Sequence, residues 1–117
     1  MAQGHRRGRV HCNGRLAGVI EETPGGYRFA YDAAYLEDPE SAAVSLTLPK
    51  RRSPFESTRL FAFFHGLLAE GSTKDLQCRL LRIDESDHFG RLLKTAHSDV
   101  IGAVTVLEAE EETGRGP

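Results

Sequence analysis

The chain has 117 residues, with 15 Lys and Arg against 17 Asp and Glu, a formal net charge of −2 and a hydrophobic content of 39%. These values are typical of one ordinary globular domain, and they exclude an intrinsically disordered chain, which would carry fewer aromatic residues and a larger net charge. No apolar run approaches the ~20 residues of a membrane-spanning helix, and we identify no secretory signal in the sequence. The 2 cysteines are too few for a disulfide framework. We therefore expect a cytoplasmic protein whose Cys12 and Cys78 are reduced thiols.

The first part of the chain predicts a meander of three antiparallel strands. The Asn-Gly pair at 13–14 separates residues 10–12 from residues 15–20. Such a pair favours a type I′ hairpin turn, because both of its residues tolerate positive φ. The Pro-Gly-Gly turn at 24–26 leads into residues 27–31, whose alternating aromatic side chains share one face of a strand.

Two further strands are predicted, one on each side of a helical block. Residues 44–48 alternate cleanly, with Val44, Leu46 and Leu48 facing one way, and Pro49 ends this strand because it lacks a backbone donor. Residues 101–107 are β-branched and apolar on both faces, which is typical of a central or well-covered strand.

The block between these strands predicts three short helices. Residues 53–56 have capping-box spacing with proline at the favoured first position, so a helix is expected from about 57 to 69, with Gly71 as its C-terminal cap. A second helix is expected to begin at Ser72 or Thr73 and to end near Arg82. Its apolar stripe is formed by Leu76, Leu80 and Ile83.

A third helix is expected from Ser86 to about Ala96, with Phe89, Leu92 and Leu93 facing the core. The fold class is therefore α+β. We expect a small, curved antiparallel or mixed sheet, or a partial barrel, of about five strands, with about three short helices inserted before the last strand.

Charge is uneven along the chain, and it predicts the domain boundaries. The segment 1–8 is expected to be a basic flexible tail, residues 9–108 the folded domain, and residues 109–117 an acidic, polar tail. Basic arms can bind nucleic acid, and the loop at 50–52 could contact phosphate or an acidic partner. The pI near 6.2 nevertheless argues against a dedicated DNA-binding domain.

Motifs that would indicate catalysis are missing from the sequence. It has no GxxxxGK phosphate loop, no GxGxxG and no Gly-x-Ser-x-Gly, and no two histidines stand four residues apart as on a metal-binding helix. The stretch 87–90 differs from the kinase Asp-Phe-Gly motif because His88 interrupts it, and we expect Phe89 to be a core residue instead. We therefore predict no catalytic, cofactor-binding or metal site, and a protein that is not an enzyme.

The most informative segment is 60–69, which contains no charged residue. Large apolar side chains would cover an arc of roughly 160° of the expected helix, which is wider than the stripe of a surface helix. The other side holds Ala62, His65, Gly66 and Ala69. Either the rest of the domain covers this helix on both sides, or the side of small residues is left for a partner protein, with His65 projecting from it.

Taken together, the motifs resemble the N-terminal subdomain of the HipA-type serine/threonine kinase toxins, over about residues 9–108. The matching segments, in order, are residues 10–18, 25–31, 44–49, 54–55, 63–71 and 101–106. In the family a kinase core follows this subdomain, whereas here the sequence ends in a short polar stretch, and Ala69 stands where a proline is usual.

A copy of this subdomain without the kinase core is similar to the small HipS components of three-part HipBST toxin–antitoxin systems. The resemblance implies a non-catalytic antitoxin, without a cofactor, that binds and neutralises a HipT/HipA-like serine/threonine kinase toxin. A HipB-like DNA-binding protein would join a ternary complex, so no direct DNA binding is expected. We predict that the interface with the kinase comprises Phe61, Ala62, His65, Ala69 and Glu70.

Two alternatives remain open at this point. The chain could be an N-terminal fragment or subunit of a HipA-type kinase with no inhibitory role of its own. It could also be a nucleic-acid-binding module that uses Arg6, Arg7, Arg9 and the basic loop at 50–52. An in-frame kinase downstream would support the first alternative, and salt-dependent retention on DNA would support the second.

Overall fold

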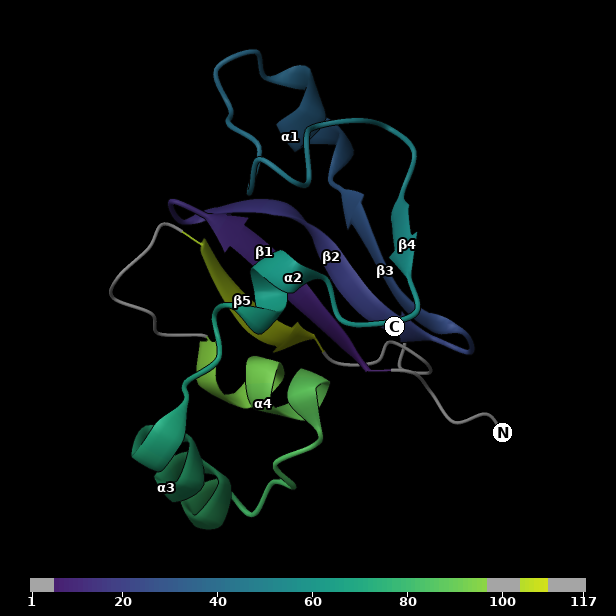
Figure 1. Ribbon diagram of the computed structural model, residues 1–117. Coiled ribbons are helices and arrows are strands. Elements are labelled where there is room, and N and C mark those ends of the chain that lie inside the picture. Colours follow the sequence, from purple (N-terminus) through teal and green to yellow (C-terminus); the bar gives the residue numbers. More distant parts are fainter. Residues whose placement is uncertain (1–5, 97–103, 110–117) are drawn as a thin grey trace, which may run out of the picture.

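A five-stranded antiparallel sheet forms the centre of the computed structural model, which describes residues 6–96 and 104–109 (Figure 1). The strands lie in the order β4-β3-β2-β1-β5. Their bounds are β1 Arg7–Cys12, β2 Arg15–Thr23, β3 Gly26–Tyr31, β4 Phe55–Ser57 and β5 Val104–Ala109. The helices are α1 Ala33–Glu37, α2 Ala62–His65, α3 Gly71–Leu81 and α4 His88–Thr95. The expected α+β class is confirmed, and the sheet is open rather than a closed barrel.

The three-stranded meander is confirmed, with the turns where the sequence placed them. Asn13 and Gly14 both have positive φ, 54° and 82°, as the hairpin between β1 and β2 requires. β1 begins at Arg7, inside the segment that the sequence assigned to a tail, and a bulge follows at Val10/His11.

The predicted strand at 44–48 is wrong. Val44 and Leu48 are buried, but Leu46 is 98% exposed, so the three side chains do not share a face. The Tyr31 hydroxyl accepts a hydrogen bond from the Val44 amide and donates one to the Leu48 carbonyl, which pins both ends of the segment to β3. Ser45 Oγ accepts from the Thr47 amide and closes a local turn. Side chain–backbone bonds therefore replace the ladder that alternation alone predicted.

The fourth strand of the sheet is β4, in residues that the capping box assigned to the start of a helix. Phe55 stacks against Phe29 of the neighbouring strand, with ring centroids 6.5 Å apart, and the Arg51 guanidinium lies 3.7 Å from the centroid of Phe55. Both contacts are with residues outside the capping box at 53–56 on which the helix prediction is based. The helix predicted for 57–69 is correspondingly reduced to α2, and Gly71 begins α3 instead of capping the helix before it.

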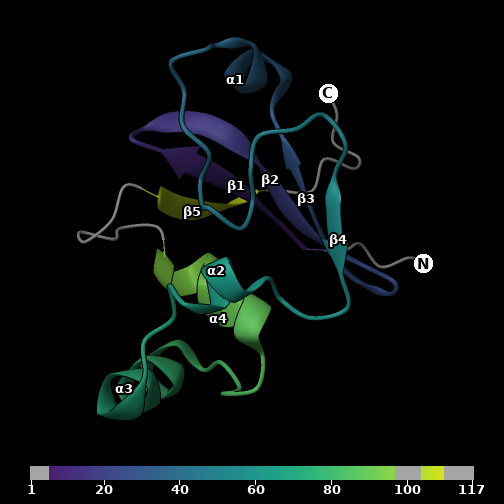
Figure 2. The same cartoon turned by 45° about the horizontal axis from the view of Figure 1, so that its top comes forward.

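The core lies between the sheet and one layer formed by α2 and α4 (Figures 1 and 2). Its largest fully buried side chains come from both layers: Val10, Ile20, Phe29 and Val106 from the sheet, and Phe64, Phe89 and Leu92 from the helices. The expected third helix is thus confirmed as α4, with Asp87 rather than Ser86 as its cap, because Asp87 Oδ1 accepts from the Gly90 amide at 3.0 Å.

The last strand is a sheet edge, because β5 pairs only with β1 among the described residues. Val104 and Val106 face the core while Leu107 is 42% exposed, so β5 is covered on one face and is not central. Residues 101–103 of the predicted strand lie outside the described residues.

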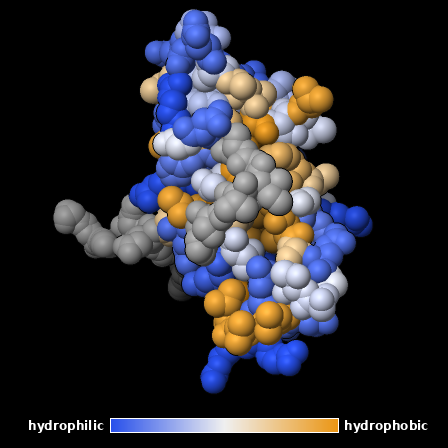
Figure 3. Space-filling view, turned by 90° about the vertical axis from the view of Figure 1, so that its left-hand side faces the viewer, coloured by the Kyte–Doolittle hydropathy of each residue, from blue (hydrophilic) through white to orange (hydrophobic). Residues whose placement is uncertain are grey.

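The apolar stripe predicted for the second helix does not face the core. α3 lies at the end of the molecule far from the sheet, and Leu76 and Leu80 on it are 52% and 71% exposed. A space-filling view shows hydrophobic residues gathered at this end (Figure 3). On the inner side of α3, Cys78 is a buried free thiol, as is Cys12 on β1. Within the described ranges, the structure has no helix of the length and apolarity needed to cross a membrane.

Candidate partner-binding surface

The short helix α2 points adjacent side chains in opposite directions. Phe64 is fully buried and its ring packs on Phe29, with centroids 5.6 Å apart. Ala62, His65 and Gly66 are exposed. This division arises because one face of α2 closes the hydrophobic core of the sheet. The outward face is therefore the side of small residues around a histidine, and among the described residues nothing covers it.

His65 contacts a second histidine, His88, which begins α4. The two rings meet edge to face, with centroids 4.8 Å apart and an interplanar angle of 78°. The pair separates two hollows in the surface, and both histidines line both of them. The first hollow, of about 450 Å³, lies toward α3, and the second, of about 780 Å³, lies toward the end of β4 and includes Tyr27 and Ala62.

Burial lowers the pKa of His88 below its ordinary value of 6.5, and the nearby charges of His65 and Arg91 lower it further. Asp87 acts in the opposite direction. The imidazole of His88 is therefore mainly neutral at pH 7 and can accept a hydrogen bond as well as donate one. The pair consequently presents polar groups at the boundary of the two hollows without a fixed charge on His88.

Polar contacts fix the segments that carry this surface. Arg91 Nη2 donates to the Ala69 carbonyl at 2.7 Å, which ties the connection between α2 and α3 to α4. Lys74 of α3 forms an ion pair with Glu85, 3.6 Å long, across the loop that precedes α4. These contacts position the walls of the first hollow.

A second set of contacts holds α4 against the sheet. The Arg6 guanidinium donates to both carboxylate oxygens of Glu22, at 2.9 and 2.8 Å, and to both of Asp87, at 3.0 and 2.9 Å. Hydrogen bonds from Arg6 lower the pKa of Glu22 and of Asp87. Because Asp87 caps α4, this clamp places His88 relative to the sheet.

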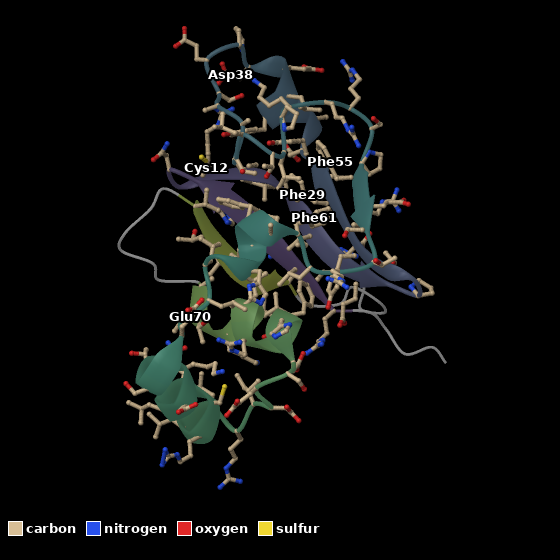
Figure 4. The ribbon with its side chains drawn as sticks, in the orientation of Figure 1. Cys12, Phe29, Asp38, Phe55, Phe61 and Glu70 are labelled. Atoms are coloured by element: carbon tan, nitrogen blue, oxygen red, sulfur yellow. The ribbon has the colours of Figure 1, made fainter. Side chains whose placement is uncertain are left out.

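The structure divides the five residues predicted for the partner interface. Ala62 and His65 are exposed, and Ala69 and Glu70 line the first hollow together with His65. Phe61 packs against the core, with its ring centroid 6.3 Å from that of Phe64, whereas Glu70 lies just before α3 (Figure 4). Phe61 is thus only partly exposed and belongs mainly to the core.

Among the residues of this surface that the sequence did not predict are three that carry nitrogen donors: Lys74, His88 and Arg91. They lie on α3 and α4, whose spacing in the sequence carries no signal of their approach to α2. The one clue was that Arg91 falls among the apolar residues of the predicted third helix.

The basic loop at 50–52 is largely engaged within the domain. Lys50 Nζ donates to the carbonyls of Asp38 and Ser41 at 3.0 and 2.9 Å, and Arg51 donates to the carbonyls of Ser53 and Pro54 at 3.1 and 3.0 Å. These contacts weaken the case for a phosphate-binding role. Within residues 6–96 and 104–109, no group of three His, Cys, Asp or Glu side chains could hold a metal ion.

The sequence matches the model of the HipA N-terminal domain over residues 8–107. The chain belongs to the HipA N-terminal domain family. A solved structure, the N-terminal domain of HipA toxin, agrees with a TM-score of 0.68 and 32% identity, covering 95% of this chain and 99% of that one. This HipA N-terminal domain therefore has both the sequence and the fold of the family.

Two curated relatives differ in how much they contain besides the domain. An uncharacterised protein of Haemophilus influenzae is 36% identical over 106 residues, which cover 91% of this chain and 95% of that protein. A candidate kinase of Sinorhizobium fredii, Y4mE, is 34% identical over 104 residues, which cover 88% of this chain but only 24% of that protein. This chain therefore spans about a quarter of the length of Y4mE.

Proposed function

We propose that this HipA N-terminal domain is a non-catalytic, cytoplasmic antitoxin that binds and neutralises a HipT/HipA-like serine/threonine kinase toxin, in a complex that also contains a HipB-like DNA-binding protein. The observation that carries the proposal is the outward face of α2. Ala62, His65 and Gly66 are exposed there, beside two hollows. Small residues let a partner backbone approach closely, and the hollows offer places for its side chains.

The relatives support a domain that can act apart from a kinase. The Haemophilus influenzae protein consists almost entirely of the matched domain, while Y4mE carries it as a minor part of a longer chain. A surface that meets a kinase within one chain could serve equally well between two chains. The proposed interface comprises Ala62, His65, Ala69 and Glu70, with Phe61 contributing through its exposed edge.

A second candidate function is favoured by the match to Y4mE. The domain could be the N-terminal part or a subunit of a HipA-type kinase, with no inhibitory role of its own. In that case the same face would be covered by the kinase permanently, as in an ordinary contact between domains. The two functions differ in whether the separate domain suppresses a kinase that is toxic without it.

Co-expression with a HipT/HipA-like serine/threonine kinase from the same genome tests the proposal. We expect the chain to restore growth and to co-purify with the kinase. The substitution His65→Glu should abolish both effects, because it buries a carboxylate at the centre of the interface. Ala33→Glu introduces the same negative side chain at an exposed position of α1, at the end of the molecule opposite α3 and away from α2, and serves as the matched control.

Each result has a distinct meaning. Rescue that is lost in His65→Glu and kept in Ala33→Glu supports an antitoxin that acts through the α2 face. A complex without rescue supports the second candidate, a structural subunit. Absence of both binding and rescue contradicts the proposal, as does rescue that survives His65→Glu undiminished, which would place the interface elsewhere.

A further inference from the structure

Arg91 is a buried cation that forms no ion pair with any residue in 6–96 and 104–109. It is 5% exposed, and it is the one charged side chain among the described residues that is buried. Its guanidinium has five N–H donors, yet the structure gives it a single hydrogen bond, to the Ala69 carbonyl, and no ion pair within the described residues. Among the described residues, the guanidinium atoms of Arg91 are not counted with the buried side-chain atoms that lack a partner, so its remaining donors are open to solvent.

The side chain reaches the wall of the first hollow, where its free donors can meet a ligand. His65, His88 and Lys74 line the same hollow from α2, α4 and α3. Side chains with N–H donors therefore line this hollow from three elements in addition to Arg91. The volume of about 450 Å³ is ample for a small group.

The acidic residues at this hollow limit what it can accept. Glu70 and Glu85 also line it; Glu70 is exposed, and the side chain of Glu85, paired with Lys74, is 59% exposed. Two carboxylates against Lys74 and Arg91 leave no excess of fixed charge. A polyanion such as nucleic acid would be repelled at the rim, whereas one compact anion could reach the inner wall.

We propose that the first hollow is a binding site for a single oxyanion, a carboxylate or a phosphate group, seated on the guanidinium of Arg91 and bordered by His65 and His88. A guanidinium suits such a group because its planar fork can donate two parallel hydrogen bonds to two oxygens. The oxyanion would be either a free anion or an acidic or phosphorylated side chain of a bound protein. The site itself does not depend on the antitoxin proposal, because the domain alone presents all of its residues.

Binding of a carboxylate such as acetate at this site should tighten as the pH falls from neutrality toward the lowered pKa of His88. The ring of His88 contacts His65 of α2, and the charged groups that act on it are Arg91 of α4, the capping residue Asp87 and Lys74 of α3. An anion beside it would favour the protonated imidazole, so ligand and proton promote each other's binding.

The test follows the ring resonances of His65, His88 and His11 by NMR in the full chain during titration with inorganic phosphate and, separately, with acetate. We expect saturable shifts at His65 and His88 and none at His11, which lies on β1 outside the hollow. Arg91→Gln should weaken binding at least about tenfold, the loss expected for one charge-assisted bidentate contact. Arg79→Gln removes the same charge from an exposed position that does not line the hollow, and it should bind as the parent does.

If Arg91→Gln does not fold, two other measurements test the oxyanion site: binding to Lys74→Gln, and the pKa of His88 with and without phosphate. Lys74→Gln should weaken binding several-fold, and saturating phosphate should raise the pKa of His88 in the unaltered chain. The absence of saturable shifts with either anion overturns the site, and so does an equal loss in the Arg91 and Arg79 variants. Release of bound phosphate when the kinase binds assigns the oxyanion to the partner, and phosphate that stays bound in the complex assigns it to a free anion.

Discussion

The Arg6 clamp should make a measurable, pH-dependent contribution to stability. One guanidinium joins Glu22 at the end of β2 to Asp87 at the start of α4 through four side-chain hydrogen bonds. It also lies 5.6 Å from the ring centroid of Phe89, the first large core residue of α4. The substitution Arg6→Gln removes all of these contacts at once.

The size of the effect follows from geometry and exposure. The side chain of Arg6 is 41% exposed, with Glu22 at 25% and Asp87 at 34%, so solvent screens each pair. An exposed ion pair contributes about 0.2–1 kcal/mol, and bidentate geometry places both pairs toward the upper end of that range. We therefore expect Arg6→Gln to lower the free energy of unfolding by about 1–2 kcal/mol at pH 7 and low salt.

Urea denaturation at several pH values is the appropriate assay. Both carboxyls have a pKa below their ordinary values of 4.5 and 3.8 in the folded state, because Arg6 hydrogen-bonds to them. Their contribution is fully present above those ordinary values and is lost as the pH falls through the folded-state values. The difference between the parent and Arg6→Gln should thus be constant from pH 8 to pH 6, shrink below about pH 4, and also shrink in 1 M salt.

Arg9→Gln provides the control, since it removes the same charge from an exposed position on β1. We expect it to change the free energy of unfolding by less than about 0.5 kcal/mol. A difference for Arg6→Gln that is the same at pH 7 and pH 3 would refute the electrostatic explanation, and equal effects of the two variants would show that only net charge matters.

Three further substitutions test the packing. Phe64→Ala should cost about 3–5 kcal/mol in urea denaturation, because it empties a fully buried site beneath α2. Tyr31→Phe should cost about 1–3 kcal/mol and remove the hydrogen-exchange protection of the Val44 amide, since the hydroxyl that accepts from it is gone. Gly18→Ala should cost at least about 2 kcal/mol in the same assay, because its Cβ would collide with the Ala30 carbonyl oxygen in β3. A tolerated substitution at any of these positions would contradict the packing described there.

The elements that could be predicted from the sequence are those set by local chemistry. The hairpin at Asn13 and Gly14 depends on two residues that accept positive φ, so neighbouring residues alone determine it. The helix around Phe89 follows from a cap and an apolar face that are close together in the chain. In these elements, local preference and tertiary structure agree.

The errors occur where distant residues decide the structure. The alternation in residues 44–48 predicts a strand, but the Tyr31 hydroxyl holds this segment as a turn. The capping-box spacing that ends at Glu56 predicts a helix. Instead, the ring of Phe55 stacks against that of Phe29, and the segment pairs with β3 in the sheet. Helical periodicity predicted α3 correctly. It could not show that Leu76 and Leu80 would be exposed to solvent, because that depends on where α3 lies relative to the core.

Only the part of the candidate site that lies within one segment could be predicted from the sequence. Small residues around His65 in an uncharged segment suggested an outward face, and Ala62, His65 and Gly66 are exposed. That inference used one segment only. Arg91 is separated from His65 by 26 positions, and only the packing of α4 against α2 brings the two to one hollow.

The proposed function is testable because two adjacent residues of α2 differ in exposure. Phe64 and His65 are neighbours in the chain, but one is fully buried and the other is exposed. Changes at exposed positions of this kind usually alter stability by less than about 0.5 kcal/mol. Loss of kinase binding in a stably folded His65 variant would therefore report on the surface itself, whereas the same loss in Phe64→Ala would report on the fold. Substitutions at these two adjacent positions thus separate the effect on partner binding from the effect on stability. Substitutions of the exposed leucines of α3 could not do so, because no partner is assigned to that helix.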